Sequence, residues 1–285
     1  LNRWFLDLKC EMMQERFPVT KADVDQMEAF LENPIPLAEE LIGRFSPHWF
    51  MAFRDVTNAV LARTAVFAMI PLMAVGHKAP LLFTELQPTE TSCLLATVTS
   101  FQFDYVARQN IGGSSMSYFV LKQLPAPPPA AFMGLCPWDT PCSLACWIAS
   151  RAIELTYTAW DIAPFGADCG YSGPPFEWNE DRRFTIRCEL DAALFHLYLG
   201  TAAEWLRDGS PELLRYFPTP RHAVDYMMDT FRILKERDEA AHSDYRTKTR
   251  ILDIYDAMGE VMAANAAAVA AGRKLDDVAF CSMRR

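Results

Sequence analysis

The chain has 285 residues, of which 51% are hydrophobic and 22% charged, a composition typical of a soluble globular protein. No apolar run reaches the ~18 residues that a membrane helix needs, so we expect no contact with a membrane interior. With 27 basic and 36 acidic residues the net charge is −9, which excludes a global positive field and restricts any DNA contact to a local surface. The chain begins with Leu1 and no signal peptide follows, so we expect a piece of a longer polypeptide.

The first half of the chain has a mixed pattern. Residues 48–54 and 64–70 are aromatic and β-branched runs of strand length. Between residues 91 and 108 apolar side chains recur at helical spacing, which predicts one amphipathic helix. Residues 111–116 are expected to form a turn and residues 117–121 a short strand.

The proline-rich residues 125–129 are the clearest boundary, since consecutive prolines neither join a helix nor donate to a sheet. Beyond them the glycines and prolines of residues 161–178 predict an irregular connector. The sequence therefore predicts an α+β protein, with a mixed α/β domain at residues 1–135 and a mainly α-helical domain at residues 136–285. Four helices are expected in the second domain, around residues 144–155, 186–197, 224–234 and 251–261.

The eight cysteines are too few for a disulfide scaffold in a chain of this length, and they favour a reducing cytoplasm. Cys136, Cys142 and Cys146 are close enough in sequence to be considered as zinc ligands. Their spacing contains no C-x2-C knuckle and no second pair follows, which favours free thiols. We expect a cytoplasmic protein without a metal site.

No catalytic motif is recognisable: the chain has no P-loop, no nucleophile elbow, no zinc-protease helix motif and no dinucleotide-binding glycine motif. Residues 173–176, Gly-Pro-Pro-Phe, resemble the Asn-Pro-Pro-aromatic signature of amino-methyltransferases, but Gly173 has no side chain to bind a base. Residues 168–173 only faintly resemble a cofactor loop, and the two signatures would overlap. We expect no catalytic residues here. The histidines are far apart in sequence, and structural or surface roles are favoured for His48, His77, His196, His222 and His242.

Several stretches resemble a known family. Residues 53–71 contain Arg-Asp-Val-Thr-Asn, Arg-Thr and a final Ile-Pro, and residues 100–125 contain Asp-Tyr-Val-Ala-Arg, Gly-Gly and Lys-Gln-Leu-Pro. These motifs are similar to those in the specificity region of large adenine-N6 DNA methyltransferases of bacterial restriction-modification and phage-defence systems. Weaker matches continue to about residue 260, so that the resemblance covers most of the chain.

In that family the catalytic signatures lie upstream of the matched stretch. The resemblance therefore implies a target-recognition region that binds double-stranded DNA, reads bases in a groove and presents an adenine to the methyltransferase core upstream in the same chain. Other subunits of a defence system are further expected partners. S-adenosylmethionine is expected for the full-length enzyme, and no cofactor is expected in this piece.

The expected DNA-binding residues surround a Gly-Gly-Ser-Ser turn, where backbone N–H groups and two hydroxyls can approach a phosphate because glycine has no Cβ. Arginine and glutamine can read base edges, and lysine suits a phosphate. An ordinary turn held by its own polar residues is the alternative. The candidates are Arg54, Asn58, Arg63, Arg108, Gln109, Gly112, Gly113, Ser114, Ser115 and Lys122.

Two other functions stay open. The acidic, helical second half also fits a protein-interaction module that docks on a methyltransferase or defence complex without contacting DNA. An independent enzyme would need a pocket with converging titratable groups, which the sequence does not locate. Tyr245, Arg246 and Lys248 could touch a DNA backbone, although a helix surface with intramolecular ion pairs is favoured.

Overall fold

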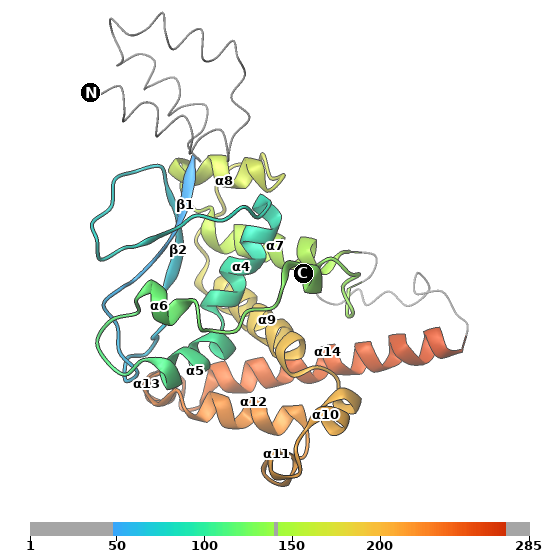
Figure 1. Cartoon of the computed structure of the whole chain (residues 1–285). Coiled ribbons are helices and arrows are strands. Elements are labelled where there is room, and N and C mark those ends of the chain that lie inside the picture. The colour runs from blue at the N-terminus through green and yellow to red at the C-terminus, as the bar shows by residue number, and fades with distance from the viewer. Residues whose placement is uncertain (1–47, 140–141, 272–285) are drawn as a thin grey trace, which may run out of the picture. The chain divides into compact units, whose positions relative to one another are not determined.

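The computed structural model describes residues 48–139 and 142–271, which belong to a compact unit that begins at His48 (Figure 1). Within these ranges a small antiparallel sheet is followed by helices, so the predicted α+β class is confirmed. No helix in the described ranges combines the length and the apolar composition that crossing a membrane requires.

The sheet has three strands in the order β2-β1-β3, formed by β1 (Trp49–Phe53), β2 (Phe67–Pro71) and β3 (Leu81–Leu82). Both predicted strands are confirmed, although β2 begins at Phe67 rather than at residue 64. Side chains alternate between the two faces of a strand, and opposite pairs such as Phe53 and Phe67 therefore share the buried face. That face packs on α4 (Pro88–Thr99) and α5 (Phe101–Asn110).

The single helix predicted for residues 91–108 is wrong, because Ser100 divides it into α4 and α5. Ser100 has extended backbone angles, and its hydroxyl accepts a hydrogen bond from the N–H of Phe103. Serine is a favoured N-cap residue, so it ends one helix and starts the next.

The strand predicted for residues 117–121 is also wrong, since this segment forms the short helix α6 (Tyr118–Leu121). The Ser117 hydroxyl caps it by accepting from the N–H of Val120. Residues 111–116 contain no helix or strand, as expected for a turn, and the proline stretch leads into the 3-10 helix η1 (Pro129–Phe132).

The second half is helical, as predicted. The stripe at residues 224–234 belongs to two helices, because buried Phe231 has non-helical backbone angles between them. The predicted connector 161–178 is irregular only in part, since it includes the end of η2 (Trp160–Ile162) and all of α8 (Ala163–Asp168). The elements are α7 (Leu144–Thr156), η2 (Trp160–Ile162), α8 (Ala163–Asp168), α9 (Glu180–Leu199), α10 (Ala202–Asp208), α11 (Pro211–Tyr216), α12 (Pro220–Asp229), α13 (Arg232–His242) and α14 (Arg246–Ala270).

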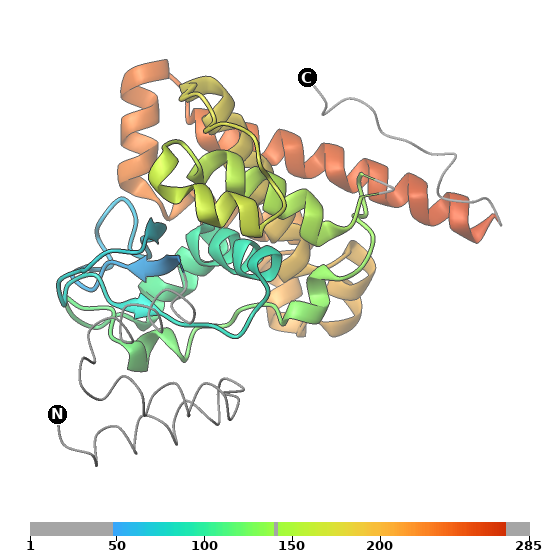
Figure 2. The same ribbon diagram turned by 90° about the horizontal axis from the view of Figure 1, so that it is seen from above.

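Two hydrophobic clusters hold these elements together. One joins the sheet, α4 and α5 to Ile153 and Tyr157 of the second half, and the other joins α7, α9 and α14 to Cys93 and Phe101 of the first half. The proposed boundary at residue 135 therefore does not separate two cores. In both views the blue sheet lies at one side of the unit and the red α14 extends away from it (Figures 1 and 2).

Candidate nucleic-acid interface

The structure places two of the predicted segments side by side. Residues 54–66, which connect β1 to β2, run next to residues 111–116, which connect α5 to α6; we call them the paired loops. Backbone contacts hold them together, so the predicted candidates on both loops belong to one surface region. The contacts are Thr57 N to Ser114 O (3.1 Å), Met116 N to Asp55 O (2.8 Å) and a β-bridge between Val56 and Ser115.

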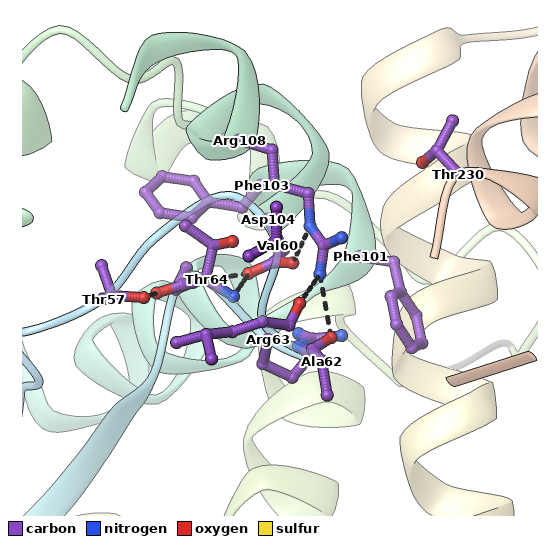
Figure 3. A network of polar contacts seen from close by, with 12 residues as sticks. Thr57, Val60, Ala62, Arg63, Thr64, Phe101, Phe103, Asp104, Arg108 and Thr230 are labelled. Carbon is purple, nitrogen blue, oxygen red and sulfur yellow. Dashed lines mark hydrogen bonds and ion pairs between the residues drawn. The ribbon is translucent and has the colours of Figure 1, made fainter. Parts of the chain in front are cut away.

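Asp104 on α5 holds the first of the paired loops, residues 54–66, from the interior of the protein. One oxygen of its carboxylate accepts the backbone N–H groups of Thr64 (2.8 Å) and Ala65 (2.5 Å). The Asp104 side chain is completely buried, so these hydrogen bonds are shielded from water. Figure 3 shows the carboxylate pointing into the loop.

Arg108 holds the same loop one helical turn further along. Its guanidinium donates to the carbonyl oxygens of Leu61 and Ala62, both at 2.9 Å, and its Nε donates to Asp104 at 2.9 Å (Figure 3). It also lies 4.2 Å over the ring of Phe231, and only 11% of its side chain is exposed. We expected Arg108 to read a base, but these contacts direct its guanidinium into the protein, where it fixes the loop.

Arg63 and Asn58 also make internal contacts. The Arg63 guanidinium donates to the carbonyl of Thr99 and lies 4.2 Å over the ring of Phe101. The Asn58 side chain accepts the N–H of Val60 at 3.1 Å, which is how an asparagine stabilises its own turn. For Arg63 and Asn58 these contacts fit the alternative stated above, an ordinary turn that its own polar residues stabilise.

The other candidates lie on the outside of the paired loops or beside them. Arg54 is exposed, although one of its N–H groups donates to the carbonyl of Arg63 at 3.0 Å. Ser115 donates to the carboxylate of Asp55. The exposed candidates are Arg54, Gln109, Gly112, Gly113, Ser114, Ser115 and Lys122.

An acidic residue lies within this surface. Asp55 accepts hydrogen bonds from the Ser115 hydroxyl and from the Lys78 ammonium group, the latter at 3.0 Å. The hydroxyl of Ser115, followed by Lys78, lowers the pKa of the Asp55 carboxyl. The pairing with Lys78 offsets the negative charge that Asp55 would otherwise present to a phosphate.

The two glycines of the turn are not required by the fold. Neither has a positive φ, and a Cβ added to either would meet nothing within 4 Å. Gly166 on α8 differs, because a Cβ there would lie 2.8 Å from the ring of buried Tyr157. The space above Gly112 and Gly113 is therefore open to solvent or to a ligand.

Three residues of the helical half make intramolecular contacts instead of forming a basic surface. Lys248 forms ion pairs with Asp225 (2.9 Å) and Asp229 (2.8 Å) on α12. Arg246 pairs with Asp181 at 3.0 Å, and the buried Tyr245 hydroxyl donates to the carbonyl of Met228.

The cysteines considered as zinc ligands differ in environment. Cys136 is buried, Cys142 is half-buried and Cys146 is exposed. Burial raises the pKa of the Cys136 thiol to about 12 and that of Cys142 to about 11, which opposes formation of thiolate ligands. Among the described residues, no group of three His, Cys, Asp or Glu side chains is arranged to hold a metal ion.

In comparisons with known proteins, the chain matches no family model, no curated protein and no solved structure.

Proposed function

We propose that this chain is the DNA-binding target-recognition portion of an S-adenosylmethionine-dependent adenine-N6 DNA methyltransferase of a restriction-modification or phage-defence system, and that it is not catalytic by itself. The observation that carries the proposal is the juxtaposition of the paired loops. Two stretches far apart in sequence, which both resemble the specificity region of that family, are joined by backbone hydrogen bonds and present exposed polar groups together.

Rigidity of the loops supports this assignment. A recognition surface gains affinity when its conformation is set before binding, because less conformational entropy is lost on association. Asp104 and Arg108 satisfy four backbone groups of residues 61–65 from inside the protein. Contacts within the protein thus hold the first of the paired loops.

The exposed residues have the chemistry that a duplex requires. Arg54 and Lys122 can neutralise phosphates, and the glycines leave room for a phosphate to approach the backbone N–H groups. Gln109 can bind an adenine edge through its amide. Val60, which is 72% exposed near the tip of the first loop, can contact the methyl group of a thymine.

A salt titration tests the proposal. The affinity of the chain for a fluorescein-labelled duplex is measured by anisotropy at increasing salt concentrations. Because each neutralised phosphate contributes about 0.9 to the slope of log affinity against log salt, Lys122→Ala should lower that slope by about 0.9. Arg54→Ala should lower it similarly.

Arg215→Ala is the matched control, since Arg215 is an exposed cation on α11, outside the paired loops. It should leave the slope unchanged. Wild-type binding that does not depend on salt, or equal effects of Lys122→Ala and Arg215→Ala, would contradict DNA binding by the paired loops. Methylation of adenine can be measured with the full-length enzyme, which would contain the methyltransferase core, after S-adenosylmethionine is added.

A second candidate function is docking on a methyltransferase or defence complex without DNA contact. One observation favours it: Leu206 on α10 and Tyr216 on α11 are 61% and 71% exposed, and Tyr226 on α12 is 50% exposed. Exposed apolar side chains of this size are typical of protein interfaces when they are contiguous. Under this function the salt titration gives no DNA binding, and Leu206→Lys with Tyr216→Lys abolishes binding to the methyltransferase core.

A further inference from the structure

A cleft of about 880 Å³ is lined by residues of β2 and of the helices α4, α5, α7, α9, α13 and α14. Five consecutive residues that include the start of β2, residues 65–69, form one wall, while no residue of β1 or β3 lines it. Because β2 is an outer strand of the sheet and β1 lies on its other side, the cleft runs along the free edge of β2.

The free edge offers unused backbone groups. Arg54 N donates to Val66 O, and Leu72 N donates to His48 O, which identifies the residues of β2 that bond to β1. In an antiparallel ladder this pairing alternates along the strand, so the N–H and C=O groups of Phe67 and Met69 point away from β1. Within the described ranges no protein group forms a hydrogen bond with them.

The opposite wall of the cleft is rich in arginine. Two of the arginines are neutralised, since Arg187 pairs with Glu180 at 3.2 Å and Arg246 pairs with Asp181 at 3.0 Å. The arginines that line the cleft are Arg63, Arg183, Arg187, Arg237 and Arg246. Among the described residues, no carboxylate forms an ion pair with Arg183 or Arg237.

Arg183 is a partly buried cation without an ion-pair partner among the described residues. Its guanidinium lies 3.8 Å over the ring of Trp178, and its Nε is buried without a hydrogen-bond partner in the described part of the chain. Burial, followed by repulsion from Arg187, lowers its pKa. A buried guanidinium N–H without an acceptor costs free energy, and no described residue accepts from the terminal N–H groups of Arg183 either, so these can bind an anionic group of a ligand.

We propose that this cleft binds an extended peptide segment with acidic side chains, which adds to the free edge of β2 as a new strand and places carboxylates against Arg183 and Arg237. A peptide fits better than a nucleic acid because the cleft runs along a strand edge. Only a peptide backbone offers N–H and C=O groups at the spacing of Phe67 and Met69, whereas a nucleic-acid backbone has no amide to pair with the edge of β2. This inference is independent of the proposed function.

The test uses a fluorescein-labelled peptide that alternates valine with glutamate, and its binding to the whole chain is followed by anisotropy. Methylation of alternate backbone amides removes the donors that would pair with β2, and should weaken binding about tenfold. Replacement of the glutamates by glutamine should weaken it about as much, because the partners of the arginines are lost. Equal binding by the parent and N-methylated peptides would overturn strand addition.

Protein variants locate the peptide. Arg183→Gln and Arg237→Gln should each weaken peptide binding about tenfold, while Arg215→Gln, which makes the same change on α11, should have no effect. The N-methylated peptide keeps the test decisive if a cleft variant fails to fold. Loss of duplex DNA binding in Arg183→Gln or Arg237→Gln, with peptide binding unchanged, would overturn the proposal in favour of a nucleic-acid cleft.

Discussion

Asp104 and Arg108 lie one helical turn apart on α5 and bind opposite kinds of backbone group in the same loop. The carboxylate of Asp104 accepts N–H groups of Thr64 and Ala65, while the guanidinium of Arg108 donates to the carbonyls that precede them. The two side chains also contact each other at 2.9 Å. An almost fully buried ion pair therefore sets the conformation of the first of the paired loops.

Arg108→Met should destabilise the protein strongly. Methionine retains much of the apolar stem, but it leaves the buried Asp104 charge and two partly buried carbonyls without the guanidinium. Removing one partner of a buried ion pair costs about 3 kcal/mol or more. Urea unfolding of the variant and the wild type measures this loss.

Arg232→Met is the matched control, because Arg232 is 82% exposed and its pair with Glu236 is 3.7 Å long. Its free energy of unfolding should change by less than about 0.5 kcal/mol. A similarly small change in Arg108→Met would contradict the role of Arg108 in holding the loop.

Gly112→Ala and Gly113→Ala should separate folding from binding. Neither added methyl group meets a neighbouring atom, so the free energy of unfolding should stay within about 0.5 kcal/mol of the wild type. If a phosphate approaches the turn, the same methyl groups should weaken DNA binding about tenfold. Thermal unfolding and DNA anisotropy give the two readouts.

Gly166→Ala provides the contrast, since its methyl group would lie 2.8 Å from the Tyr157 ring. Overpacking of this kind costs about 1 to 3 kcal/mol. Unchanged DNA binding in both Gly112→Ala and Gly113→Ala would contradict the role of these glycines in making room for a phosphate.

Asp191 should make stability depend on pH. Its carboxyl group lies buried in the protein, where it accepts the N–H of Phe101 at 2.7 Å. Burial raises its pKa from 3.8 to about 6, an effect that Arg63 and the Phe101 hydrogen bond reduce. The folded state therefore retains a proton that the unfolded state loses.

The direction in which stability changes with pH follows from this difference in pKa between the folded and unfolded states. The stabilisation is fully present below pH 3.8 and is lost as pH rises towards about 6. Asp191→Asn keeps an oxygen acceptor without the charge, so its stability relative to the wild type should rise by about 2 kcal/mol between about pH 4 and about pH 7. Urea unfolding at both pH values measures the change. A difference that is constant with pH would show that the folded protein does not raise this pKa.

The cysteines should differ in reactivity. Cys146 is exposed, whereas Cys93, Cys136 and Cys188 are buried, and burial raises the pKa of each of these three thiols. Iodoacetamide should modify Cys146 in the native protein at least about a hundredfold faster, because the thiolate is the nucleophile and the buried thiols require an opening of the structure. Peptide mass spectrometry measures each site, and equal rates in the folded protein would contradict the packing described.

The longer helices of the second half and the first two strands were readable from local pattern. Apolar residues at helical spacing identified α7, α9 and α14, and aromatic runs identified β1 and β2, because a buried face imposes its period on the sequence. The errors fall where a single residue changes the backbone. Ser100 and Phe231 interrupt helical stripes, and Ser117 starts a helix in a strand-like run.

The amino-acid sequence by itself determined which residue types the paired loops and their surroundings offer to a ligand. Tertiary structure alone decided which of them face solvent. Arg54 and Arg108 are chemically alike, yet Arg108 points inward because Asp104 and two carbonyls lie within its reach. Asp104 is only four residues away on the same helix, but the two carbonyls belong to residues 46 and 47 positions away, and no local pattern encodes such contacts.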